Sequence, residues 1–401
     1  MASNRPSTLL LRVDGFGWQD CLATGPGSAI LGSLLFSALF PAPMSVKFLL
    51  RVAGTLLLAW AAAAACVALH TPLPWMLGPL VATSVLSMAG APTESWGPLR
   101  NGGQWAIGAA LGLYFTPEVS ALVGSLWWAI VLGIGWALLL GWGFGAWLYR
   151  LHAPRMHGVP APMLRATSYF AGAIGAASEM TLLAERENAR TDLVAASHSL
   201  RLLIVTLTIP FALQWSGLHG LDVLAPPVRM VELQGLVLLG ALTGAGALLM
   251  DRLGRANPWF MGAMLVSMGL TMASITLSAV PQGLVNAAQL VIGVSLGVRF
   301  RADFLRAAPR WLATVAVGTL GLMAVCAAFA ALLAWGTGLP WATMVLGTSP
   351  GGIAEMSITA KVLQLGVPVV TAFQVCRLMA VLMLVAPLYR RIYPPEASAG
   401  A

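Results

Sequence analysis

Two glutamates and two arginines lie within apolar stretches of this chain, where ionisable side chains are costly and usually face a partner or a polar cavity. Glu179 and Glu355 each begin a Glu-Met pair, and Arg201 and Arg377 follow them by the same 22 residues. Such a glutamate can take up a proton or a cation, and such an arginine can attract an anionic group. The alternative is that each arginine pairs with a glutamate and holds the structure together.

The stretch around Glu355, GTSPGGIAEM, interrupts its own apolar segment. Pro350 lacks an amide hydrogen and disfavours helix at the residue before it, whereas Gly351 and Gly352 tolerate dihedral angles closed to other residues. With the break near the middle of 341–363, each arm has about 10 residues and rises about 15 Å, half of a bilayer core of about 30 Å. The pattern predicts a re-entrant hairpin whose tip shapes a cavity.

Further polar groups join this candidate site. The hydroxyls of Thr348 and Ser349 are expected to serve a purpose outside the helix, and the amides of Gln104 and Gln289 lie on short glycine-rich segments where they could line the same cavity. The alternative for the two amides is hydrogen bonding between closely packed helices. The predicted substrate- or ion-binding residues are Thr348, Ser349, Gly351, Gly352, Glu355, Arg377, Glu179, Arg201, Gln104 and Gln289.

The composition is that of an integral membrane protein. Of 401 residues, 58% are hydrophobic and only 9% are charged, and the mean hydropathy is +0.83. There is room for roughly ten to twelve spans of about 20 residues. The alternation typical of a membrane β-barrel is absent, so the spans are expected to be helices. The net charge of +8 comes without a basic run, so it indicates membrane topology and no nucleic-acid partner.

The sequence contains an internal duplication. PWMLGPLVATSVLSMAG at 74–90 is echoed by PWFMGAMLVSMGLTMAS at 258–274, and NGGQWAIGAALGLYF at 101–115 by NAAQLVIGVSLGVRF at 286–300. The Glu-Met motifs add a third block in the same order. Three ordered blocks predict a duplicated domain, with membrane repeat 1 at 44–220 and membrane repeat 2 at 221–401.

Arginines in the loops predict that the repeats are inverted. In repeat 1 the arginines follow the fourth apolar segment (Arg150, Arg155), whereas in repeat 2 they follow the third (Arg299, Arg301). Because arginine-rich loops face the cytoplasm, the corresponding loops change sides. Each half then needs an odd number of crossings. The expected fold is an all-α polytopic membrane protein with two inverted repeats, each of about five transmembrane helices plus one broken or re-entrant segment.

Residues 1–43 precede the repeats and are expected to lie outside the fold, since a basic-flanked span opens at Met44 and matches the start of the duplication. Translation from Met44 is the favoured explanation. A cleaved signal segment and an additional ordered helix are the alternatives.

The duplicated blocks, the TSPGG-x-x-EM motif and the later intramembrane arginine resemble the AbrB-type integral membrane family. The resemblance runs from about Met44 to Tyr393. The family is known for its duplicated domain, is often labelled an ammonia monooxygenase, and is distinct from the soluble DNA-binding regulators that share its name. Repeat 1 departs from the motif, with Gly172, Ile174, Gly175 and Ala176 standing where repeat 2 has Thr348, Pro350, Gly351 and Gly352.

Metal-dependent oxygenase chemistry is not expected. The five histidines show no HxxxH or carboxylate-histidine pattern on an apolar helix, and the four cysteines are scattered singly. The prediction is a protein without enzyme activity, cofactor or metal.

These features predict a secondary active transporter of a small solute in the inner (cytoplasmic) membrane of a bacterium. The arginines are compatible with an anionic solute. Proton or sodium coupling is expected because no nucleotide-binding motif is present. The expected partners are the solute or ion and the lipid bilayer, and a homodimer is left open. The alternatives are a membrane sensor that regulates a partner without moving solute, and a passive channel.

Overall fold

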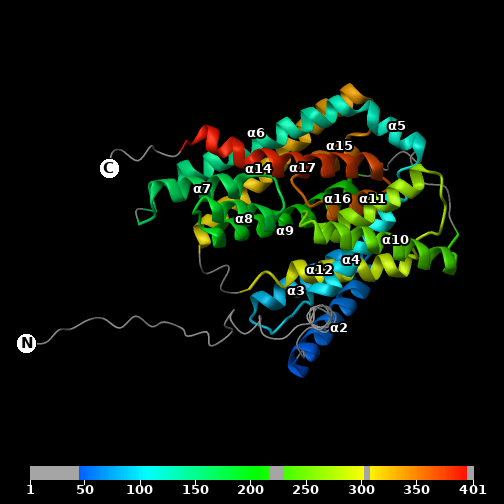
Figure 1. Ribbon diagram of the computed structural model, residues 1–401. Helices are drawn as coiled ribbons and strands as arrows, with labels where there is room; N and C mark the ends of the chain where they lie inside the picture. Colours follow the sequence, from blue (N-terminus) through cyan, green and yellow to red (C-terminus); the bar gives the residue numbers. More distant parts are fainter. Residues whose placement is uncertain (1–44, 157, 217–229, 302–307, 395–401) are drawn as a thin grey trace, which may run out of the picture. The chain divides into compact units, whose positions relative to one another are not determined.

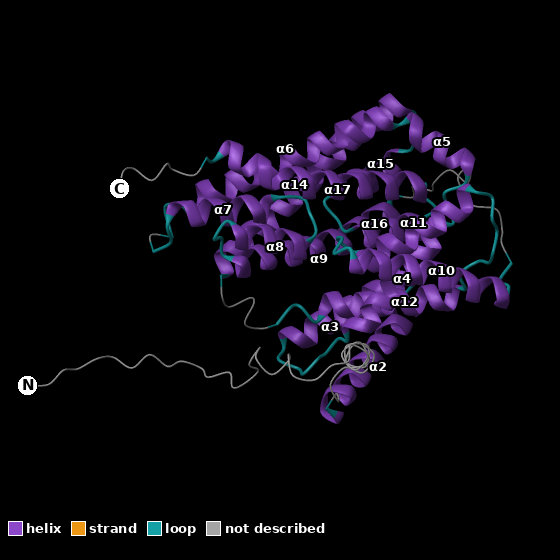
Figure 2. Cartoon of the chain, viewed as in Figure 1, coloured by secondary structure: helices purple, strands orange, loops and turns teal. Residues whose placement is uncertain are grey.

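The computed structural model describes residues 45–156, 158–216, 230–301 and 308–394 (Figure 1). All regular elements in these ranges are helices, and none is a strand (Figure 2). The predicted all-α class is therefore confirmed for the described part, while the expected extension at 1–43 lies outside it. The chain divides into the units Met1–Leu49 and Leu50–Ala401. Of the first unit, only the beginning of helix α2 is described, and the second unit contains all the other described helices.

The first half of the chain supplies eight described helices. The apolar stretch 119–148 is divided into two helices that join at Leu126, and the apolar stretch 166–184 belongs to a segment that begins earlier and is broken between residues 173 and 176. The helices are α2 (Val46–Ala68), α3 (Pro74–Met88), α4 (Gly97–Gly112), α5 (Pro117–Ser125), α6 (Trp127–His152), α7 (Ala161–Gly172), α8 (Ala177–Arg186) and α9 (Thr191–Trp215).

The second half follows the same order. Its described helices are α10 (Leu233–Arg252), α11 (Pro258–Met272), α12 (Gln282–Gly297), α14 (Pro309–Thr337), α15 (Trp341–Thr348), α16 (Ile353–Val362) and α17 (Val367–Ile392). In the described part, six helices are long and apolar enough to cross a membrane, namely α2, α6, α9, α10, α14 and α17. The pair α4 and α5, bent by 90°, would be a seventh span.

Helices α3 and α11 begin in the same way in the two halves. Each starts with a proline, Pro74 or Pro258, whose missing amide hydrogen costs nothing at a first helical position. The preceding residues, Leu73 and Asn257, both adopt a left-handed conformation, with φ of 47° and 49°. Asparagine tolerates this conformation, whereas leucine is strained in it. The fully buried side chain of Leu73 indicates that packing holds the strained turn.

Helices that correspond in the two repeats exchange partners. A Cβ atom added to Gly108 on α4 would overlap the carbonyl of Phe260 on α11, and one added to Gly293 on α12 would overlap the carbonyl of Met76 on α3. The second contact is the repeat counterpart of the first, since Gly293 lies 185 residues after Gly108 and Phe260 lies 184 residues after Met76. Helix α4 therefore packs closely against a helix of the second half, and α12 against a helix of the first.

We expect Gly108→Ala to destabilise the protein by about 1–3 kcal/mol, because the added methyl group must push two helix backbones apart. Gly124→Ala on α5 is the matched control, since its Cβ would meet open space. Thermal unfolding of the purified variants measures the difference. Equal midpoints for both variants would contradict the close approach of α4 and α11.

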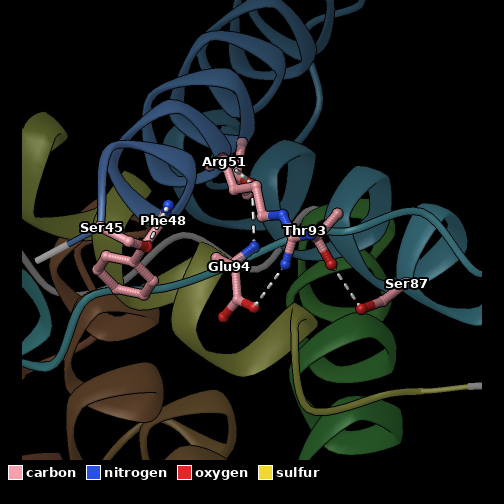
Figure 3. A network of polar contacts seen from close by, with 7 residues as sticks. Ser45, Phe48, Arg51, Ser87, Thr93 and Glu94 are labelled. Atoms are coloured by element: carbon pink, nitrogen blue, oxygen red, sulfur yellow. Dashed lines mark hydrogen bonds and ion pairs between the residues drawn. The ribbon is translucent and has the colours of Figure 1, made fainter.

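A polar cluster connects α2 to the loop that leads into α4 (Figure 3). The amide of Glu94 donates to the hydroxyl of Thr55 at 3.1 Å, and the hydroxyls of Ser87 and Thr93 lie 2.7 Å apart. The carboxylate of Glu94 is 3.9 Å from the guanidinium of Arg51, whose side chain is 50% exposed. An exposed ion pair contributes little. The bonds made by the two threonines therefore contribute more than the ion pair to fixing the loop before α4.

Apart from α2 and α5, the described helices form two groups. One contains α3, α4 and α10–α12, and the other contains α6–α9 and α14–α17. Each group takes helices from both halves of the chain. The groups meet where α16 packs on α4, within a buried apolar cluster that includes Ile107, Ile292, Ala354 and Met356. This contact carries the broken segment, and with it Glu355, to the boundary between the groups.

Candidate functional site

The expected helix break is present at residues 349–352, between α15 and α16. The hydroxyl of Thr348 donates to the carbonyl of Met344 at 2.8 Å, and that of Ser349 donates to the carbonyl of Leu346 at 3.2 Å. Both hydroxyls thus hydrogen-bond within their own helix, where the sequence predicts a purpose outside it. Each oxygen can still accept a hydrogen bond.

Arg377 on α17 closes the open end of α15. Its guanidinium donates to the carbonyls of Ser349 and Gly351, the latter at 2.9 Å, and to the side-chain oxygen of Gln374 at 2.6 Å. Gln374 in turn donates to the carbonyl of Leu346 at 2.6 Å. The last turn of a helix leaves carbonyls without partners, and α17 supplies the missing donors.

The same contacts occur 176 residues earlier. Arg201 on α9 donates to the carbonyl of Ala173 at 2.7 Å and to His198 Nδ1 at 2.7 Å. His198 Nε2 lies 2.9 Å from the carbonyl of Phe170. Because Nδ1 accepts from the arginine, Nε2 carries the proton and donates. His198 therefore does in the first half what the glutamine does in the second, at the end of α7.

His198 and Gln374 are functional neighbours that the predicted site does not include. Each stands three residues before its arginine, one helical turn away on the same face. This three-residue spacing is the sequence feature that indicates both residues as partners of the arginines. A polar residue one turn before a buried arginine is positioned to share its acceptors.

The two breaks lie near each other. The charges of Arg201 and Arg377 are close enough to interact, and each broken segment contacts the other half's long helix, α8 with α17 and α16 with α9. Both arginines are buried, with 3% and 6% of their surface exposed. Two positive charges are thus held together within the protein, with backbone carbonyls as their main partners.

The alternative of glutamate-arginine pairing is not supported by the structure. The ion pairs among the described residues involve Arg51, Arg190 and Arg390 only. Neither Glu179 nor Glu355 pairs with Arg201 or Arg377. The arginines stabilise the breaks through carbonyls, so a lock between glutamate and arginine is the wrong description.

Glu355 lies in the first turn of α16 with only 7% of its surface exposed. A helix N-terminus favours negative charge, so this position suits a carboxylate. The carboxylate occupies the space where a side chain on Gly352 would stand. The absence of a Cβ at position 352 therefore leaves room for Glu355 to fold back over the break.

The corresponding glutamate of the first half is arranged differently. Glu179 is partly exposed, and its carboxylate accepts a hydrogen bond of 2.7 Å from the neighbouring Ser178 hydroxyl. The position that matches Gly352 is Ala176. A methyl group stands there in the space that the carboxylate fills in the second half. The two motifs consequently present one buried and one partly exposed glutamate.

We expect Gly352→Ala to displace the Glu355 carboxylate from the break, because the new methyl group and the carboxylate cannot share one space. The packed neighbours of Glu355 make relocation unfavourable, and we expect a loss of about 1–3 kcal/mol in stability. Thermal unfolding measures the loss. Gly283→Ala, at a position with open space, is the control. A Gly352→Ala variant as stable as this control would contradict the placement.

The remaining predicted residues, Gly351, Gln104 and Gln289, each lie in a different environment. Gly351 does not face open space, since a Cβ there would lie 2.8 Å from the Met356 side chain, as one on Gly175 would from Met180. Gln289 is buried, and Gln104 is partly buried. They follow Ala288 and Gly103, which mark the close approach of α12 and α4. Neither amide forms a hydrogen bond with another described residue.

A metal centre finds no support in the described ranges, where no group of three or more His, Cys, Asp or Glu residues could hold an ion. The helices, the two breaks and their buried arginines define a polytopic helical membrane protein. The chain belongs to the AbrB family, whose model, described as "Transition state regulatory protein AbrB", matches residues 75–393.

Two curated relatives extend this comparison. The chain is 25% identical over 353 residues to "Uncharacterized protein YhjN" of Bacillus subtilis, covering 80% of this chain and 87% of that protein. It is 27% identical over 346 residues to "Putative regulator AbrB" of Escherichia coli, covering 83% of this chain and 94% of that protein. The similarity in each case extends over nearly the whole relative.

Proposed function

We propose that this protein is a secondary active transporter of a small anionic solute in the inner membrane. The observation that carries the proposal is the pair of buried arginines at two adjacent helix breaks, which have no carboxylate partner among the described residues. Buried charge is costly in a membrane and is usually kept for function. A solute carboxylate or similar anion would supply the missing negative charge.

Glu355 supplies the second part of the proposal. It is buried at the break without a cationic partner in hydrogen-bond contact, so a proton or a sodium ion would relieve the cost of its charge. A site that holds an anion beside a titrating carboxylate can couple the two. The anion and the coupling ion are thus expected to bind within one cavity between the broken helices.

The proposed topology is a pair of inverted repeats, and the exchange of sides by the arginine-rich loops supports it. We expect cysteines placed beside Arg155 and Arg301 to react from the cytoplasmic side only, although these residues follow the fourth segment of one half and the third of the other. Membrane-impermeant thiol reagents applied to intact and opened cells give the answer. Labelling from opposite sides would exclude inversion.

Uptake by proteoliposomes tests transport itself. A library of small carboxylates and phosphates is presented with an imposed pH gradient, a sodium gradient, or neither. A transporter shows uptake that saturates and depends on one gradient, whereas a channel shows flux that follows the solute gradient alone. Absence of any flux for all solutes would count against transport.

A regulatory membrane protein is the second candidate, because both the family description and the name of the Escherichia coli relative describe a regulator. Such a protein would bind its ligand without moving it. Ligand-induced thermal stabilisation without flux in the same liposomes would favour this candidate over the transporter.

A further inference from the structure

A small cavity lies between α9, the middle of α3 and the end of α12. It has a volume of about 10 Å³, and its lining includes Ser199, Leu202, Thr206, Leu296 and Arg299. This volume is about the minimum that holds one water molecule. The exposed Arg299 stands in the arginine-rich loop that follows α12. Its lining thus includes both a residue of this loop and residues near the middle of α9.

Thr206 has an unusual hydroxyl. It is fully buried and has no hydrogen-bond partner among the described residues, whereas Thr83, Thr243 and Thr319 each donate to the carbonyl four residues earlier. Pro210 lacks the amide hydrogen that would bond the Thr206 carbonyl in a regular helix. A buried hydroxyl without a partner is costly, and a bound water removes the cost.

The cavity adjoins Glu355 through one side chain. A Cβ placed on Gly352 would lie 3.3 Å from Leu202 Cδ1 and 2.9 Å from Glu355 Cδ, so the leucine and the carboxylate flank the same point. The charge of Arg299 also acts on Glu355. Leu202 is thus the side chain between the carboxylate and the polar cavity.

The corresponding positions of the other half are less polar and carry no charge. The duplication places Val375, Leu382 and Tyr114 at the positions of Ser199, Thr206 and Arg299. The two aliphatic hydroxyls and the cation of the cavity are therefore present only on the side of the buried glutamate, and the other half has the phenol of Tyr114 in their place. The partly exposed Glu179 faces no equivalent lining.

We propose that this cavity is the hydrated route by which protons reach Glu355 from the arginine-rich side. A water is held at the Thr206 hydroxyl, and the Leu202 side chain is the gate. The coupling role of Glu355 rests on the proposed function, whereas the hydration of the cavity does not. The proposal also names the coupling ion, because a cavity that holds a single water can relay a proton along hydrogen bonds but has no room for hydrated sodium.

Hydroxyl-radical footprinting of the full-length protein tests the hydration without any solute. Radicals formed from a bound water oxidise the side chains beside it, so Leu202 and Leu296 are expected to be modified rapidly. Their repeat counterparts, Leu378 and Leu111, are the matched controls and are expected to be protected. Protection of Leu202 and Leu296, or equal modification of all four leucines, would overturn the proposal.

Thr206→Val tests the route. The variant keeps the shape of the side chain and removes its hydroxyl, so it should abolish the footprint at Leu296 and slow proton-driven uptake roughly fivefold, the loss expected for one hydrogen bond of about 1 kcal/mol. Thr319→Val, which removes only a bond within α14, is the control and should change neither readout. Unchanged uptake by the Thr206→Val protein would refute the route.

The two proposals fail in different ways. If the wild-type protein moves no solute, transport is excluded while the footprint still decides whether the cavity is hydrated. If uptake is driven by sodium and ignores the pH gradient, the protein remains a transporter and the proton route is wrong.

Discussion

Arg377→Met is expected to lower the stability of the protein by about 2–4 kcal/mol, because it leaves the buried carbonyl of Gly351 without a donor, at about 1–3 kcal/mol, and leaves that of Ser349 with only the longer bond from Gln374 at 3.3 Å. Methionine keeps the length of the side chain and its apolar contacts. Thermal unfolding in one detergent measures the effect. Arg150→Met removes an exposed arginine at the end of α6 and is expected to have little influence.

A double variant distinguishes the carbonyl bonds from an ion pair. If Arg377 paired with Glu355, then Glu355→Gln would recover part of the stability lost in Arg377→Met. Since the structure shows no such pair, the two effects should add. A coupling energy above about 0.5 kcal/mol would indicate a contact between the two side chains that the structure does not contain.

Glu355→Gln is expected to reduce gradient-driven uptake by at least about 100-fold, the lower end of the contribution of a positioned proton-transfer group. Glutamine keeps the shape and the hydrogen-bonding atoms but cannot change its charge. Folding should be retained, because no cation pairs with the carboxylate among the described residues. Uptake with and without a pH gradient, together with ligand-induced thermal stabilisation, measures the two properties separately.

Glu179→Gln is the matched variant in the other half. Because Glu179 is partly exposed and bonds to Ser178, its neutralisation should change uptake far less. Equal losses for the two variants would mean that both repeats take part in coupling. Gradient-dependent uptake by Glu355→Gln itself would remove this residue from the coupling step.

The position of the break in the second half could be predicted because local chemistry determines it. Pro350 and the two following glycines interrupt a helix in any surroundings, and the structure ends α15 at Thr348 accordingly. The duplication was equally visible, since it is a property of the sequence alone. The all-helical class follows from composition, because backbone groups in a bilayer must be satisfied within each segment.

The partners of the arginines could not be predicted in the same way. Charge suggests the glutamates as acceptors, yet every residue also carries a carbonyl, and the sequence does not show which carbonyls a helix break leaves free. Arg201 and Arg377 bind those of Ala173 and Ser349 instead. Likewise, Gly351 was expected to face a cavity, but the nearest atoms belong to Met356, five residues away.

The difference between the two glutamates shows what a single methyl group decides. Ala176 and Gly352 differ by one carbon atom, and the sequence does not show how much space is left beside them. The structure shows that the carboxylate of Glu355 fills that space. The departure of the first half from the motif, with Ala176 in place of Gly352, therefore changes the space that is left for its glutamate.

The exchanged packing of α3 with α12 and of α4 with α11 has a consequence for biosynthesis. The glycine face of α4, and the face of α3 that receives the glycines of α12, enter the membrane before their partners exist, since the partner helices follow about 150 to 210 residues later in the chain. At a typical synthesis rate this delay is roughly 10 to 40 s. During that time the first half carries unfilled grooves beside lipid, so an isolated first half is expected to aggregate, and quality-control proteases would meet it before the second half arrives.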